Sequence, residues 1–129
     1  MNKEELKHRT HQFALRIIHL SEKLIEKGGC AKILADQLLR SGTSVGANYR
    51  AACIAKSNKD FLNKLKICEE EADETLYWLE LLTDTALVRP ELLTDLTNEA
   101  RQLTAILTAS IKTKRHNLTT AAAKKNCKL

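Results

Sequence analysis

The sequence predicts an all-α protein that forms an antiparallel up-down-up-down four-helix bundle, and three observations support this prediction. The 129 residues are enough for one domain with a single hydrophobic core. One proline and four glycines leave few positions for the turns that an all-β fold requires. Apolar residues recur at steps of three and four along four long segments, which is the spacing of one helical face. Helices of about 20–28 residues with short connections favour antiparallel neighbours.

The first helix is predicted over residues 8–27. Its apolar side chains recur at steps of four and three and form one face, namely Phe13, Ile17, Leu20 and Leu24. Gly28 and Gly29 end the helix, because glycine is favoured just past a helix C-terminus.

The second helix is predicted over residues 31–56 and contains the stretch RSGTSVGANYRAA, residues 40–52. This stretch does not fit a nucleotide-binding phosphate loop, which requires GxxxxGK[ST] after a buried strand. As a helix, it carries Gly42 and Gly46 on one face, where another backbone can approach closely. The two glycines cost about 2 kcal/mol of helix propensity, which close packing of helices or subunits would offset. The candidates for this packing are Ser41, Gly42, Val45, Gly46 and Tyr49, with Trp78 on the next helix.

The third helix, residues 58–86, has the strongest periodicity in the sequence. Eight positions alternate steps of four and three: Phe61, Leu65, Cys68, Ala72, Thr75, Leu79, Leu82 and Ala86. Ser57, followed three residues later by Asp60, predicts a capping box in which aspartate replaces the usual glutamate.

The fourth helix is predicted over residues 90–115. Pro90 is favoured at the first helical position, and the cations near residue 115 suit the negative end of the helix dipole. Residues 112–129 carry six Lys or Arg and no acid, whereas residues 1–111 carry the other 15 cations and all 16 acids. Because residues 116–129 lack apolar periodicity, we expect a basic, disordered tail that is either solvated or bound to phosphate.

Charge also separates along the middle of the chain. Residues 40–67 contain one acid, Asp60, against six cations: Arg40, Arg50, Lys56, Lys59, Lys64 and Lys66. Residues 69–84 contain seven acids and no base. Three interpretations stay open: solvation of both regions, head-to-tail packing of subunits in a ring, or contact of the basic region with RNA or DNA.

Three runs resemble a known family: RTHQFALRII (9–18), QLLRSGTSVGANYRAA (37–52) and DFLNKLKICEEEADETLYWLELL (60–82). They are similar to the "four helix bundle protein" family, whose founding members are encoded in intervening sequences of bacterial 23S rRNA genes. The resemblance covers roughly residues 9–110. It implies a left-handed antiparallel bundle that assembles as a cyclic homo-oligomer, usually a homopentamer. It also implies a distant relationship to an accessory protein of diversity-generating retroelements, which binds nucleic acid and a reverse transcriptase.

The sequence gives no catalytic, metal or cofactor site. No two of the four cysteines have CxxC spacing, so we expect free thiols rather than a zinc site. A di-iron site in a bundle needs two Glu-x-x-His motifs, and only Glu5 and His8 have that spacing. No apolar run is long enough to span a membrane and no secretion signal is present, so we expect a cytoplasmic protein.

We therefore expect a non-enzymatic, oligomeric scaffold that binds nucleic acid or a ribonucleoprotein. The candidates for phosphate contact are Arg40, Arg50, Lys56, Lys59, Lys64, Lys112, Lys114 and Arg115. The alternative is a protein–protein interaction scaffold whose charges serve only assembly. The partner itself is not identified by the sequence, and the cellular role of the family that it resembles is largely unknown.

Overall fold

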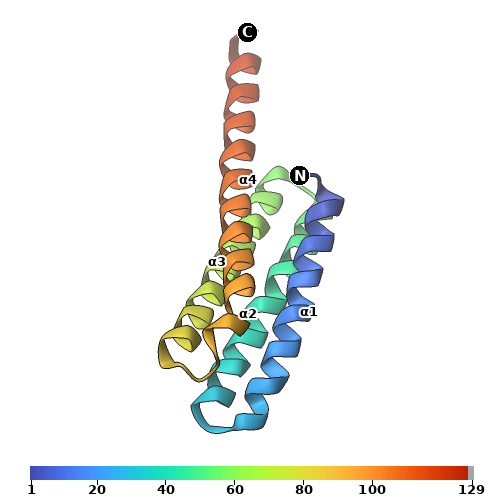
Figure 1. Cartoon of the computed structure of the whole chain (residues 1–129). Coiled ribbons are helices and arrows are strands. Elements are labelled where there is room, and N and C mark those ends of the chain that lie inside the picture. The colour runs from blue at the N-terminus through green and yellow to red at the C-terminus, as the bar shows by residue number, and fades with distance from the viewer. Residues whose placement is uncertain (128–129) are drawn as a thin grey trace.

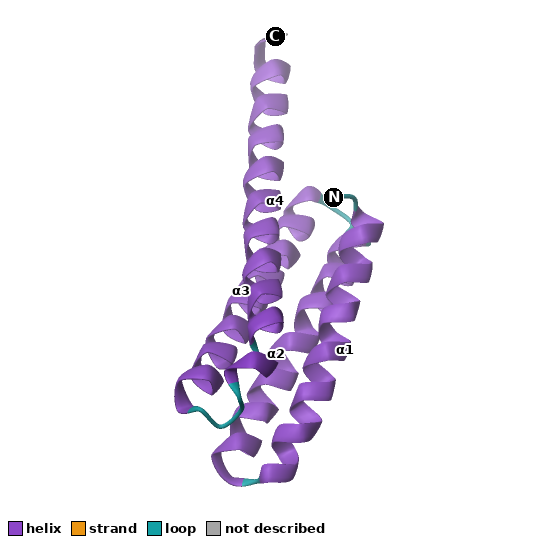
Figure 2. Ribbon diagram, viewed as in Figure 1, coloured by secondary structure: helices purple, strands orange, loops and turns teal. Residues whose placement is uncertain are grey.

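The computed structural model describes residues 1–127, and this part of the chain is helical with no strand (Figure 2). Its elements are α1 (Lys3–Lys27), α2 (Gly29–Cys53), α3 (Asn58–Thr85), the short 3-10 helix η1 (Pro90–Leu92) and α4 (Thr94–Cys127). The all-α prediction with four helices is confirmed. Figure 1 shows consecutive helices running in opposite directions, with the chain start and the α2–α3 connection at the end from which α4 projects.

The helix boundaries differ from the predicted ones where local capping was overlooked. α1 begins five residues earlier, because the Asn2 side chain accepts a hydrogen bond from the Glu5 backbone N–H (2.8 Å) and the Glu5 carboxylate accepts one from the Asn2 backbone N–H (3.1 Å). α2 ends at Cys53 rather than at residue 56. Pro90 opens η1 instead of α4, and the Leu93 N–H donates to the Pro90 carbonyl (2.9 Å).

The start of α3 has the predicted Ser57 N-cap but only one of the two hydrogen bonds of the predicted capping box, because the Asp60 carboxylate pairs with Lys64 instead of the Ser57 N–H. The Ser57 side chain accepts a hydrogen bond from the Asp60 N–H at 3.0 Å. Six of the eight positions in the predicted repeat are buried, and the exceptions lie at its two ends. Phe61 is half-buried, and Ala86 is an exposed left-handed C-cap with φ of 56°. Burial raises the pKa of the Cys68 thiol to about 12, so this cysteine stays protonated.

The C-terminal end of α4 differs most from the prediction. A disordered tail was expected over residues 116–129, but α4 continues through Cys127, and residues 128–129 lie outside the described chain. Apolar periodicity was the wrong criterion here, because alanine and lysine are strong helix formers even without a buried face. Ile111 is the last buried residue. The following 16 residues, which we call the projecting part of α4, continue for about four helical turns, roughly 24 Å (Figure 1). The first of these turns still borders the bundle, because Lys114 lies 5.5 Å from the Phe61 ring.

The stretch 40–52 is an uninterrupted part of α2 and packs closely against α1. A Cβ atom added at Gly42 would lie 2.7 Å from Ile17 Cγ2, a distance that no side chain tolerates. A Cβ added at Gly46 would lie 3.4 Å from the backbone of Thr10, which is an ordinary contact. The small face that the sequence indicates therefore accommodates a helix of the same chain. A subunit contact at this face stays a prediction.

The neighbouring side of α2 faces α3. The Thr75 hydroxyl of α3 donates to Ser41 Oγ at 2.9 Å, and both residues are buried. Val45 and Tyr49 continue this buried surface, and burial raises the pKa of the Tyr49 phenol. Trp78 of α3 is half-buried, and its ring packs edge-on against that of Tyr77, with centroids 5.1 Å apart. Residues of the stretch 40–52 therefore pack α2 between α1 and α3.

Candidate nucleic-acid interface

The fold gathers most of the chain's cations at one end. The starts of α1 and α3, the end of α2 and the C-terminal half of α4 lie together there (Figure 1). These segments are residues 1–9, 48–67 and 106–125, and they carry thirteen Lys or Arg and three acids. The rest of residues 1–127 carries seven Lys or Arg and thirteen acids. We call this surface the basic end. It joins two basic regions that the sequence analysis treated as separate.

Seven of the eight predicted phosphate contacts belong to the basic end: Arg50, Lys56, Lys59, Lys64, Lys112, Lys114 and Arg115. The eighth, Arg40, lies in the middle of α2. Its guanidinium forms ion pairs with Glu71, at 3.2 Å, and with Glu74, both on α3. The charge of Arg40 is therefore balanced by acids of the same chain, and we do not include Arg40 in the interface.

The three acids of the basic end are already engaged. Glu4 pairs with Lys7 at 2.8 Å, Glu5 caps α1, and Asp60 pairs with Lys64 at 3.3 Å. Of the other exposed cations, Lys66 pairs with Glu69 of α3 at 2.6 Å. In the part of the chain that the structure describes, no acid pairs with Lys56, Lys59, Lys112 or Arg115. These cations leave an uncompensated positive field, which attracts polyanions.

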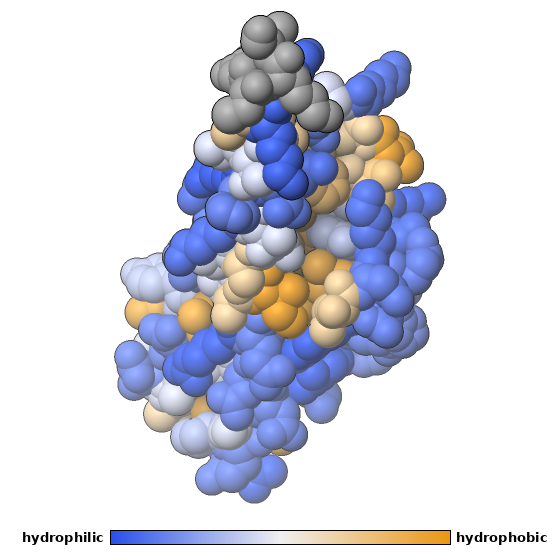
Figure 3. Space-filling view, turned by 90° about the horizontal axis from the view of Figure 1, so that it is seen from above, coloured by the Kyte–Doolittle hydropathy of each residue, from blue (hydrophilic) through white to orange (hydrophobic). Residues whose placement is uncertain are grey.

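A cavity of about 840 Å³ opens at the basic end, and we call it the end hollow. Figure 3, which looks down on this end, shows hydrophobic residues in the hollow between the helices and hydrophilic residues around them. All three segments of the basic end contribute apolar side chains to the lining. Large ones are Leu6, Tyr49, Phe61, Leu65 and Ile106. None of its eighteen lining residues is acidic.

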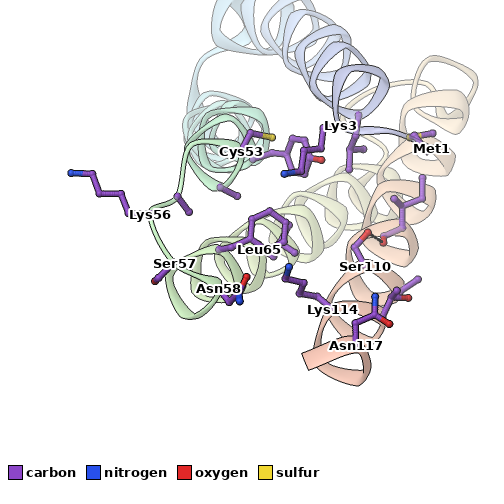
Figure 4. Close-up of a pocket in the computed structure, with 18 residues that line it drawn as sticks. Met1, Lys3, Cys53, Lys56, Ser57, Asn58, Leu65, Ser110, Lys114 and Asn117 are labelled. Carbon is purple, nitrogen blue, oxygen red and sulfur yellow. Dashed lines mark hydrogen bonds between the residues drawn. The ribbon is translucent and has the colours of Figure 1, made fainter. Parts of the chain in front are cut away.

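Two lysines point into the end hollow from opposite helices. The Lys3 ammonium of α1 lies 5.2 Å from the centroid of the Phe61 ring, and the Lys114 ammonium of α4 lies 5.5 Å from it. In Figure 4 both side chains turn inward, whereas Lys56 turns outward. Sequence reasoning missed Lys3, because it precedes the predicted start of the first helix, and treated Phe61 as a core residue. No local signal marks either as part of a cavity.

Polar links hold α4 in place below its projecting part. Arg9 of α1 donates to both carboxylate oxygens of Glu99 (2.8 and 2.7 Å) and to Gln102 Oε1 (2.7 Å). The hydrogen bonds to Glu99 raise the pKa of Arg9, so its guanidinium stays protonated. On the other side, Glu69 of α3 accepts from Lys66 and from the Thr108 hydroxyl, each at 2.6 Å. These hydrogen bonds, that of Lys66 first, lower the pKa of Glu69.

The residue types that bind metal ions are scattered in the part of the chain that the structure describes. Among the side chains that the structure describes, no three His, Cys, Asp or Glu residues gather closely enough to hold a metal ion. Of the cysteines, Cys30 is exposed, Cys53 half-buried and Cys68 buried, all as free thiols; the side chain of Cys127 lies outside the described ones. The helices of residues 1–127 include none whose length and apolar character would let it cross a membrane.

Comparison with known proteins identifies the family. The model of the 23S rRNA-intervening sequence protein family matches residues 2–109, which ends before the projecting part of α4. A solved structure of a protein of unknown function, from the S23 ribosomal protein family of Bacteroides thetaiotaomicron, is 39% identical with a TM-score of 0.79. That match covers 87% of this chain and 99% of the other. No curated protein matches the chain. On the strength of the family match, this chain belongs to the 23S rRNA-intervening sequence protein family.

Proposed function

We propose that this protein is a non-enzymatic scaffold that binds nucleic acid through its basic end. The observation that carries the proposal is the meeting of three cationic segments, residues 1–9, 48–67 and 106–125, on one surface with few acids. A nucleic acid presents one phosphate about every 3.4 Å along each strand. The projecting part of α4, roughly 24 Å long, therefore spans about seven phosphates of one strand.

The chemistry of the projecting helix also supports a polyanionic partner. Residues 112–125 contain five Lys or Arg and no acid. Leu118 is the one large apolar side chain among residues 112–125, so this helix gains little from burial and is weakly stable alone. Phosphates would remove the repulsion between its cations and stabilise it. Lys112 and Arg115, three residues apart, share one face and would contact neighbouring phosphates of the same strand.

Salt dependence tests this proposal. We expect a fluorescein-labelled DNA duplex to bind, with the logarithm of the association constant falling against the logarithm of the salt concentration. Each phosphate contact contributes about −0.9 to that slope, so contacts from the five Lys or Arg of residues 112–125 alone predict a slope near −4.5. Fluorescence anisotropy from 0.05 to 0.3 M salt measures it. Absence of binding at 0.05 M salt, or a slope near zero, would refute the proposal.

The alternative function is a protein–protein interaction scaffold whose charges serve only assembly. Large apolar side chains exposed away from the basic end favour it, namely Ile33 at 64% and Tyr77 at 53% exposure. Such a protein would retain no nucleic acid at physiological salt. The salt titration therefore separates the two functions.

We also propose that the protein assembles as a cyclic homo-oligomer, with five subunits suggested by the family resemblance. The basic end, with thirteen cations and three acids, and the rest of residues 1–127, with seven cations and thirteen acids, carry opposite net charge, which suits head-to-tail packing in a ring. Exposed acids of α3, among them Glu70, Asp73 and Glu80, lie outside the basic end and could meet it on the next subunit. Light scattering before and after nuclease treatment is expected to give about five times the 14.5 kDa chain mass. A mass of one chain would contradict the ring.

A further inference from the structure

We infer that the end hollow holds an unpaired nucleotide of the bound nucleic acid, with its base on the apolar floor and its phosphate between Lys3 and Lys114. The inference rests on the proposed function and adds a preference to it: a strand with unpaired bases binds more tightly than a fully paired duplex of equal charge.

The floor of the end hollow suits the flat face of a base. Phe61 is only half-buried because its ring closes the α3 side of the cavity, and Ile106 of α4 lies half-buried in the opposite wall. Aromatic and aliphatic surfaces of this kind stack bases without regard to sequence. A volume of about 840 Å³ falls in the range of small-molecule sites. A base inside a duplex is already stacked and enters such a cavity only after leaving the helix.

The charges of the end hollow favour an anion. Lys3 and Lys114 bring two ammonium groups to one ring, within 5.2 and 5.5 Å of its centroid, and no acidic residue lines the cavity. Two like charges that converge without a counter-charge repel each other, and a phosphate between them would remove that repulsion. Lys114 also belongs to α4, so the cavity is continuous with the cations of the projecting helix.

The rim distinguishes a nucleotide from a simple amphiphile such as a fatty acid. Asn58 and Asn117 line the cavity from α3 and α4, and Ser57 and Thr113 add hydroxyl groups (Figure 4). Amide groups match the mixed donors and acceptors of base edges. A hydrocarbon chain offers no partner for them, so we favour the nucleotide.

A cavity-filling variant tests the inference. Ala109 is exposed, lines the end hollow and lies on α4, so Ala109→Phe places a ring in the cavity without changing the charge. The matched control is Ala105→Phe, one turn earlier on α4, at an exposed position that does not line the cavity. We expect Ala109→Phe to weaken binding of labelled oligothymidylate roughly tenfold and to leave a DNA duplex of the same length unaffected. Ala105→Phe is expected to change neither, and circular dichroism verifies that both variants are folded.

A second variant keeps the test informative if Ala109→Phe fails to fold. Lys3→Gln removes a charge at the exposed start of α1, and Lys23→Gln removes one near its other end. We expect Lys3→Gln to weaken oligothymidylate more than duplex, and Lys23→Gln to weaken neither. Equal effects on both probes, or no effect of filling the cavity, would overturn the inference while duplex binding still supports the proposed function. Loss of oleate binding in Ala109→Phe, with both nucleic acids unaffected, would also overturn it. Failure of the unaltered protein to bind either probe would refute the proposed function itself.

Discussion

Replacing Lys59, Lys112 and Arg115 together by glutamine is expected to weaken duplex DNA binding on the order of 10²–10³-fold at 0.1 M salt. All three side chains are exposed at the basic end and none pairs with an acid in the described part of the chain. Each lost phosphate contact lowers the steepness of the salt slope by about 0.9. The triple variant should therefore have a slope shallower by about 2.7. Anisotropy titrations of the same labelled duplex measure both effects.

A matched variant separates local contacts from overall charge. Replacing Lys23, Lys27 and Lys32 by glutamine removes the same number of charges from exposed positions around the α1–α2 turn, at the opposite end of the bundle. The account predicts that this control changes affinity less than about threefold, because those side chains lie far beyond a Debye length of about 10 Å from the bound phosphates. Similar losses in both triple variants would mean that net charge, and not the basic end, governs binding.

Replacing Gly42 by valine is expected to lower the free energy of unfolding by about 3 kcal/mol. The new Cβ would lie 2.7 and 2.8 Å from the two γ-carbons of Ile17. Ile17 is fully buried, so α1 and α2 must separate locally to relieve the overlap. Urea unfolding followed by circular dichroism, at one fixed protein concentration, measures the change.

The control for this prediction is Gly46→Ala, one helical turn along the same face. Its Cβ would meet the backbone of Thr10 at 3.4 Å, an ordinary van der Waals contact. Alanine is also the better helix former, so this variant should be unchanged or up to about 1 kcal/mol more stable. If Gly42→Val were as stable as the unaltered protein, the lack of a side chain at Gly42 would not be needed for the packing of α2 on α1.

Features that depend on nearby residues could be predicted from the sequence. The apolar repeat of α3 and the Ser57 cap are local patterns, and the structure contains both. The helical character of residues 40–52 follows from the spacing of Gly42 and Gly46. The tail was mispredicted for a local reason too, since helix propensity and not periodicity decides a helix with no buried face.

Features that depend on distant residues could not be predicted. Arg40 is neutralised by Glu71 and Glu74, more than thirty positions later, and no local pattern indicates that pairing. The basic end forms only when α4 returns beside the α2–α3 connection. The end hollow takes its lining from four helices, so it requires the assembled bundle.

The position of bound nucleic acid on the protein can be mapped, and it distinguishes the basic end from every other surface. Hydrogen–deuterium exchange with and without saturating oligothymidylate reports which backbone segments become protected. The proposed interface predicts slower exchange in residues 1–9, 48–67 and 106–125, with the largest change in the projecting part of α4, where most side chains are exposed. Protection confined to the α1–α2 turn or to the acidic stretch of α3 would contradict it.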